Sequence, residues 1–347
     1  MDHTTGTLDT SGTLDEALQR LHTSGPERHG WLSNHGPMAV EALVRHGQAG
    51  SVHRWLDHYR NKLEDMPSLN SRITATNWRA ALGDPQRIAD WTAYFERETA
   101  ERPWREVLAE WWPRLLPGIA AGATHPVIRV GHAVRTLLSG DAGAPRVTEL
   151  AHGLGYWAAR HQLLPEITLT GRTQSAAASL DAVPLVPEQE GGIRDRFAQL
   201  TAFPDWPAAS ASDPESARAD LSELVTAAVH RYATHGYGEP VMLVHAATAP
   251  NAVLRTLPAL PRELWPSSLA AAWAASAAVT AAYAPTAPAS YAPTGTLTAE
   301  DIFERAAAHG DDHTIKFADT ALDVGDQAAL IAGLRSIELN EPVFSRR

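Results

Sequence analysis

The feature of this 347-residue chain that most constrains its fold is the spacing of its apolar side chains, which recur every three or four positions along most of its length. Val127, Val130, Val134 and Leu138 are one example. Such spacing places apolar groups on one face of an α-helix, where they can be buried together. Almost no segment alternates apolar and polar residues over five positions, as a half-buried strand does. We therefore predict an all-α fold.

The helical pattern also predicts how the chain is divided. Residues 1–13 are rich in Thr, Gly and Ser, and we expect them to form a flexible N-terminal lead. We expect residues 14–347 to form a single helical domain with long irregular loops. The longest of these loops is residues 162–212, which are rich in proline and show little periodicity. Because a loop of this length is more often functional than idle, we interpret it as an irregular excursion over a cleft.

The composition excludes several classes of protein. The chain has no cysteine, which excludes disulfides, thiolate metal sites and cysteine nucleophiles. Its formal net charge of −11 argues against a nucleic-acid-binding protein, which needs a basic surface. The most apolar run, residues 267–283, is mostly alanine and is too short and too weakly hydrophobic for a membrane span. With no signal peptide visible, we expect a cytoplasmic protein that is not associated with a membrane.

Histidine is unusually abundant, with 16 residues, and four of them lie in apolar or tightly turned sequence. These four are His35, His132, His245 and His313. Taken singly, each is more often a hydrogen-bonded core residue than a ligand. Taken together in a chain without cysteine, they predict a metal centre with imidazole ligands, most naturally non-haem iron or zinc.

His125 is a fifth candidate in the same stretch of sequence as His132. The two are seven residues apart, which corresponds to about 10 Å along an α-helix, so they cannot both bind one ion from a regular helix. His125 precedes Pro126 and therefore lies at or before the start of the predicted helix. We expect it to face the substrate or to support a ligand.

Lys316 is unusual because the chain contains only one other lysine, Lys62, whereas its other basic residues are arginines. It follows His313 by three positions, so the two share a helical face. Burial lowers the proton affinity of a lysine, and a neutral amine can react with CO₂ to give a carbamate, which is an anionic oxygen ligand. The alternative is a surface lysine that pairs with Asp312 or Asp319.

These segments together resemble the questin oxidase-like family of fungal and bacterial polyketide pathways, over about residues 14–335. The segments that carry the resemblance are 34–38, 77–83, 125–133, 244–246 and 312–317. The resemblance implies a helical oxygenase that acts on anthraquinone-like aromatic polyketides and opens a ring by oxidative C–C cleavage. A small aromatic molecule is thus the expected partner, and the oligomeric state stays open.

The resemblance also implies a set of site residues. Fe(II) would be held by four imidazoles and a carboxylated lysine, with O₂ as co-substrate, and the implied ligands are His35, His132, His245, His313 and Lys316. His125 would act as a catalytic general base on a substrate phenol, since an imidazole near neutrality suits that task. Which four histidines bind the metal stays open, because His125 lies in the same motif as His132.

Two other functions remain as alternatives. One is an NADPH-dependent Baeyer–Villiger monooxygenase without a metal, although the chain lacks the G-x-G-x-x-G pattern of a dinucleotide-binding fold. The other is a non-catalytic helical protein that binds a small molecule. Trp31, Trp78 and Trp157 are candidates for an aromatic pocket wall, with packing in the core as the alternative.

Overall fold

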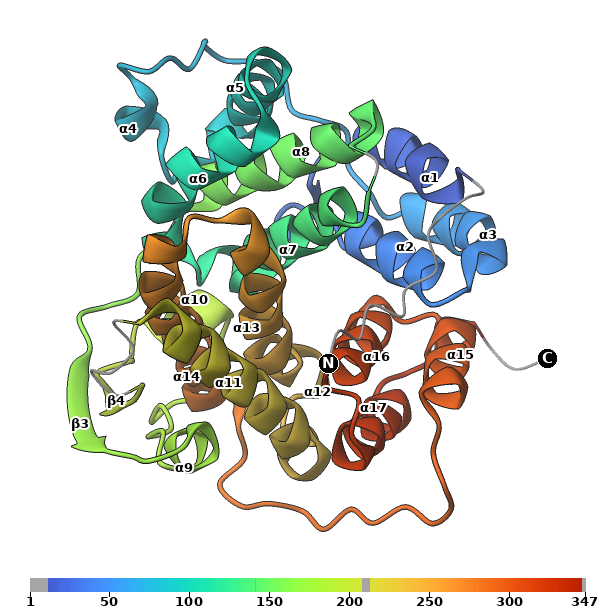
Figure 1. The fold of residues 1–347 in the computed structure, drawn as a ribbon, viewed down its shortest axis with the longest axis vertical. Coiled ribbons are helices and arrows are strands. Elements are labelled where there is room, and N and C mark those ends of the chain that lie inside the picture. Colours follow the sequence, from blue (N-terminus) through green and yellow to red (C-terminus); the bar gives the residue numbers. More distant parts are fainter. Residues whose placement is uncertain (1–11, 141, 208–212, 345–347) are drawn as a thin grey trace.

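The computed structural model describes residues 12–140, 142–207 and 213–344, and it confirms the all-α prediction with 65% helix and 4% strand (Figure 1). Residues 1–11 of the predicted flexible lead lie outside the described residues. The first helix begins at Thr13. No helix in the described ranges combines the length and the apolarity needed to cross a membrane.

The N-terminal and C-terminal helices pack together around one of two hydrophobic cores. These helices are α1 (Thr13–His22), α2 (Gly36–Arg45), α3 (Ala49–Arg60), α15 (Ala299–His309), α16 (Asp312–Val324) and α17 (Gln327–Leu339). Two short antiparallel strands, β1 (Glu27–Arg28) and β2 (Leu32–Ser33), join α1 to α2. Segments almost 300 residues apart in the sequence thus lie side by side, as the blue and red ribbons in Figure 1 show.

The central part of the chain forms the larger core, which is rich in tryptophan and alanine. Its helices are α4 (Trp78–Ala81), α5 (Ile88–Glu101), α6 (Trp104–Leu115), α7 (His125–Leu138), α8 (Ala144–Arg160), α11 (Pro214–His235), α12 (Pro240–Leu243), α13 (His245–Thr256) and α14 (Trp265–Tyr283). Trp78 and Trp157 are packed in this core, which was the alternative to their lining a pocket.

The segment 162–212 carries more regular structure than the sequence suggests. It contains two short strands, β3 (Thr168–Arg172) and β4 (Ala202–Asp205), which pair in parallel. It also contains two short helices, α9 (Ala176–Asp181) and α10 (Ile193–Phe197). The strands escaped sequence analysis because β3 is exposed along its whole length, so burial imposes no alternating pattern on it. Residues 208–212 lie outside the described ranges.

Four helices meet where the two cores adjoin: α7 packs against α2 and α13, and α16 packs against α2 and α13. The contact between α7 and α13 is unusually close. A Cβ atom added at Gly131 of α7 would lie 2.6 Å from the Cα of Ala252 in α13, a distance that real Cβ atoms do not adopt. Only glycine therefore permits this approach, which brings the start of α13 to the start of α7.

Candidate metal centre

Each of the four helices that meet at the centre has a histidine at its first residue or directly next to it. His35 directly precedes α2, His125 and His245 are the first residues of α7 and α13, and His313 is the second residue of α16. All four side chains are buried. Local sequence explains these helix starts. Proline follows one or two positions after His35 and His125, where it suits the first turn, and Asp311 caps α16 by accepting a hydrogen bond from the Thr314 amide.

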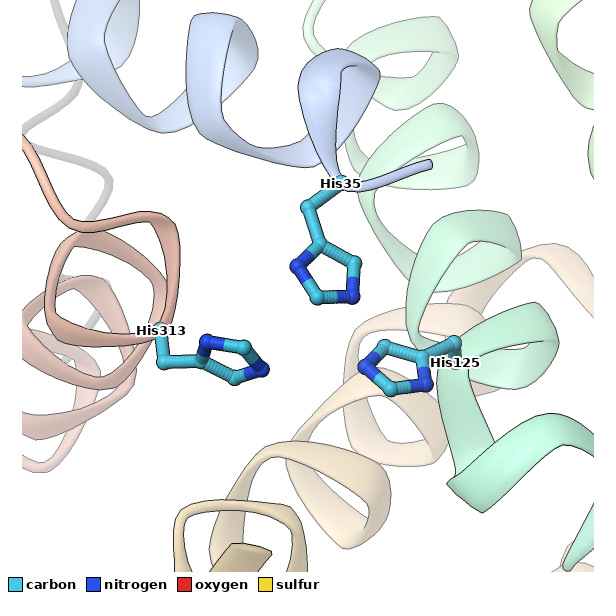
Figure 2. Close-up of side chains that lie close together, drawn as sticks. All are labelled: His35, His125 and His313. Atoms are coloured by element: carbon cyan, nitrogen blue, oxygen red, sulfur yellow. The ribbon is translucent and has the colours of Figure 1, made fainter. Parts of the chain in front are cut away.

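The four imidazole rings lie close together. Figure 2 shows His35, His125 and His313 arriving from three different helices, and each offers a ring nitrogen within 4.8 Å of the other two. His245 completes the group, because its Nε2 lies 2.9 Å from the Nε2 of His125. The rings of His35 and His125 stack at 4.3 Å between centroids.

Every one of these rings is oriented through its Nδ1 atom. Asp312 Oδ1 accepts a hydrogen bond from His35 Nδ1 at 2.6 Å and lies 2.9 Å from His313 Nδ1. His125 Nδ1 donates to the Gly122 carbonyl at 2.6 Å, and His245 Nδ1 donates to the Met242 carbonyl at 2.9 Å. Carbonyl and carboxylate oxygens accept and do not donate here, so the protons lie on Nδ1 and the Nε2 lone pairs are free.

Burial keeps three of these imidazoles, those of His35, His125 and His245, neutral. Desolvation lowers the pKa of His35 to about 3, assisted by Lys316. Desolvation likewise holds the pKa of His125 and the pKa of His245 well below the ordinary histidine value. The Nε2 atom of His35 is buried and has no hydrogen-bond partner among the described residues. Neutral imidazoles with unused lone pairs are the form in which histidine binds a metal ion.

Lys316 lies one helical turn after His313 and is only 1% exposed. Its Nζ has no hydrogen-bond partner among the described residues. Burial lowers the pKa of Lys316 to about 8, although Asp312 and Asp311 oppose the shift. Lys316 is therefore not the surface lysine that the sequence left open as an alternative. The side chain is a buried amine next to the histidine group.

The backbone before His125 is strained. Gly122, Ala123 and Thr124 have φ values of 50°, 57° and 67°, so three consecutive residues occupy the left-handed region. For alanine and threonine this conformation costs on the order of 1–3 kcal/mol each, and such strain is concentrated at functional sites. Here it turns the chain so that the Gly122 carbonyl meets the His125 ring.

His132, which the sequence proposed as a ligand, lies in a different cluster seven residues further along α7. Its Nδ1 lies 2.7 Å from a Glu41 carboxylate oxygen, and Glu41, His132 and Asp319 form a second group of potential ligands. The carboxylates of this group are already paired, however. Arg135 bonds to both Glu41 and Asp319, and Arg255 Nη2 lies 2.7 Å from Asp319. This second cluster is a buried ion-pair network.

The structure thus brings together His35, His245, His313 and Lys316 with His125, and it places His132 elsewhere. The one sequence feature that pointed to His125 was the proline after it, because Pro126 indicates that a helix begins there. All four histidines of the group lie at the start of a helix, which the sequence analysis did not notice. A linear pattern does not show which helix ends meet in the fold.

A cavity of about 390 Å³ opens next to the histidine group. His35, His125 and His313 form part of its wall, together with Tyr156 and Trp31. Residues 191–194, 196 and 197 also line it, which agrees with the interpretation of residues 162–212 as a segment over a cleft. The volume is within the range of cavities that bind small organic molecules. Of the three candidate tryptophans, Trp31 lines this cavity.

Comparison with known proteins identifies one similarity. Residues 32–140 match the family model described as Questin oxidase-like, and the matched segment contains His35, His125 and His132. No curated protein matches the chain. The match confirms the family resemblance over this segment, whereas His245, His313 and Lys316 lie outside it.

Proposed function

We propose that this protein, whose residues 32–140 match the questin oxidase-like family, is a non-haem iron oxygenase that cleaves a ring C–C bond of an anthraquinone-like aromatic polyketide with O₂. The proposed ligands are His35, His125, His245, His313 and carboxylated Lys316. The observation that carries the proposal is a group of four buried imidazoles beside a buried amine and a cavity: His35, His125 and His313 offer nitrogens within 4.8 Å of one another, and His245 Nε2 lies 2.9 Å from His125 Nε2.

The residues fit a metal ion. The Nε2 atoms of His125 and His245 lie 2.9 Å apart, and both have their proton on Nδ1. Two lone pairs at this distance repel, and a shared cation removes the repulsion. Imidazole ligands suit iron, zinc and copper alike. The choice of iron rests on the family resemblance.

Lys316 fits the role of an anionic ligand. The ammonium group first loses one proton. The neutral amine then attacks CO₂, forms an N–C bond as one C–O π bond opens, and releases a second proton, so a cationic side chain becomes an anionic carbamate. A pKa of about 8 keeps more of the amine neutral near physiological pH than an ordinary lysine would have. Asp312, the nearest carboxylate, already contacts His35 and His313 through their Nδ1 atoms.

A bound iron ion would supply the redox chemistry by which O₂ reacts with an aromatic ring. The protein residues would position the substrate. The cavity presents Tyr156 and Trp31 to a planar ring next to His35, His125 and His313. Asp312 and the carbonyls of Gly122 and Met242 would hold the imidazoles in one tautomer.

This proposal changes two roles that the sequence suggested. The Nδ1 of His125 donates to the Gly122 carbonyl, and its Nε2 lone pair faces the Nε2 of His245, so we assign it as a ligand in place of a general base. We assign His132 to the ion-pair network of Glu41, Arg135 and Asp319.

The test is metal analysis combined with turnover. The purified protein is expected to contain one iron per chain, to consume O₂ with a hydroxyanthraquinone, and to lose this activity on chelation and regain it with Fe(II). Activity that survives chelation and requires NADPH would support the metal-free monooxygenase. A protein that binds the anthraquinone but holds no metal and turns nothing over would support the non-catalytic alternative.

A further inference from the structure

The cavity next to the histidine group differs in charge from the rest of the chain. The whole chain has a formal net charge of −11. Arginine nevertheless dominates the charged residues of the cavity wall, which are Arg28, Arg160, Arg194, Arg196 and Glu239. An excess of one charge in a partly enclosed space creates a local potential that attracts ligands of the opposite charge.

Among the described residues, one of these four arginines has a carboxylate partner. Arg160 pairs with Glu27. The other three, Arg28, Arg194 and Arg196, form no ion pair with a carboxylate of residues 12–140, 142–207 or 213–344. Glu239 is the one carboxylate on the cavity wall, so the wall keeps a positive excess.

Arg196 is held in place without losing its charge. Its Nη1 donates to the Ala282 carbonyl at 3.0 Å, and its Nε donates to the Gly191 carbonyl at 3.3 Å. Its guanidinium also lies over the Tyr283 ring, 4.4 Å from the centroid. Carbonyls and an aromatic face orient a guanidinium but carry no formal negative charge. The group is therefore fixed in advance for an anion.

Arg28 provides a second cation nearer to the histidine group. Its guanidinium interacts with the Tyr59 hydroxyl through its charge and a side-chain hydrogen bond, and its charge also acts on Lys316. Its Nε is buried and has no hydrogen-bond partner among the described residues. A buried donor without an acceptor is costly, and a ligand oxygen would remove that cost.

We propose that the cavity binds its aromatic ligand as an anion, with a carboxylate or an ionised phenol held by Arg196 and Arg194 of the α10 region. This inference deepens the proposed function, on which it rests for the reaction, by naming the class of substrate as aromatic acids. The recognition itself is a binding event that requires no turnover.

The experiment compares two ligands that differ in one group. A trihydroxy-methylanthraquinone and the same molecule with a carboxyl group in place of the methyl are titrated into the purified protein by calorimetry, at low and high salt. The carboxylated ligand is expected to bind about tenfold more tightly or better, with a preference that weakens at high salt.

Arg194→Gln and Arg196→Gln are each expected to reduce this preference severalfold. Arg218→Gln, which alters an exposed arginine of α11 outside the cavity, is expected to leave it unchanged. Arg194 is exposed, so its variant keeps the fold even if Arg196→Gln does not. Repeating the titrations at rising pH separates the two anions. If the phenolate is recognised, the methyl ligand gains affinity as its phenol ionises.

Equal affinity for both ligands, together with no gain in affinity as the phenol ionises, would overturn this inference. This outcome is separate from failure of the proposed function. A protein that prefers the acid but has no oxygenase activity retains the anion site, whereas one that turns over neutral ligands without any preference retains the oxygenase alone.

Discussion

The Nε2 atoms of His125 and His245 lie 2.9 Å apart in the interior, at the first residues of two helices that begin 120 positions apart in the chain. Each ring donates its Nδ1 proton to a backbone carbonyl, so neither Nε2 carries a proton that could bridge the pair. Desolvation also keeps the pKa of both rings far below neutrality. Two lone pairs at this distance repel, and a cation beside them would remove the repulsion.

Replacing His125 and replacing His132 should have different effects on metal content. His125→Ala is expected to weaken metal binding more than about 100-fold, since even the loss of an outer hydrogen-bond partner typically costs about 10–100-fold. His132→Gln should keep the metal and lower the free energy of unfolding, because it disturbs the Glu41 network. Metal content by mass spectrometry and denaturation by urea check both. Loss of metal from His132→Gln alone would restore His132 as a ligand.

Asp312 orients two of the proposed ligands, so we expect Asp312→Asn to weaken metal affinity about 10–100-fold without removing a ligand. Competition with a chelator of known affinity measures the change. Asp311→Asn is the matched control, because it removes the same charge one residue away, while asparagine can still cap α16. If the two variants lose equal metal affinity, the loss comes from the missing negative charge and not from the orientation of the His35 and His313 rings.

Lys316 is predicted to act through a carbamate. Lys316→Ala should lose metal and activity, and small carboxylates such as acetate should restore part of both, because they can occupy the space and supply the missing anionic oxygen. Lys316→Arg should show no rescue, since arginine forms no carbamate and fills the space. Native mass spectrometry should find one added CO₂ on the wild type only. Full activity in the arginine variant is incompatible with this role.

Because α7 packs closely on α13, adding one methyl group at Gly131 should lower the stability of the fold. Gly131→Ala places a Cβ 2.6 Å from the Ala252 Cα and should destabilise the fold by about 1–3 kcal/mol. It should also weaken metal binding, because α7 and α13 carry His125 and His245. Gly50→Ala in α3 is the control, since no atom lies within 4 Å of its added Cβ, and it should be neutral or stabilising. Equal unfolding midpoints for the two variants would contradict the prediction.

Glu149 should make stability depend on pH below about 5. Burial raises the pKa of this carboxyl, but Arg129, through its charge and two hydrogen bonds, and His22, at 2.9 Å, together outweigh burial and hold the pKa at about 2, below the ordinary value of 4.5. Because the folded pKa is the lower one, the stabilisation is present above pH 4.5 and is lost as the pH falls towards 2. The loss should be about 3 kcal/mol.

Urea denaturation of the wild type at a series of pH values checks this dependence. Glu149→Gln should be less stable at neutral pH, because Arg129 is left without its partner, and its stability should fall less steeply between pH 5 and pH 2. Parallel curves for the two proteins would assign the acid sensitivity to other carboxylates.

The helical fold could be predicted from local pattern, because the period of the apolar residues decides which face of a helix is buried. The apolar settings of His35, His245 and His313, and the rarity of lysine around Lys316, also mark these residues in the sequence. The charged wall of the cavity was not predictable. Arg28 and Arg196 lie far apart in the chain, and no local pattern distinguishes an unpaired arginine from a paired one.

The sequence by itself determined the helices and most of the residues at the centre, since both depend on neighbours within a few positions. Only the tertiary structure showed that His125, and not His132, lies with the other three histidines. Both lie in one helical motif, and the choice depends on which end of α7 meets α2, α13 and α16. That end is placed by the left-handed turn before His125 and by the close contact of Gly131 with Ala252, a residue more than 100 positions away in the chain.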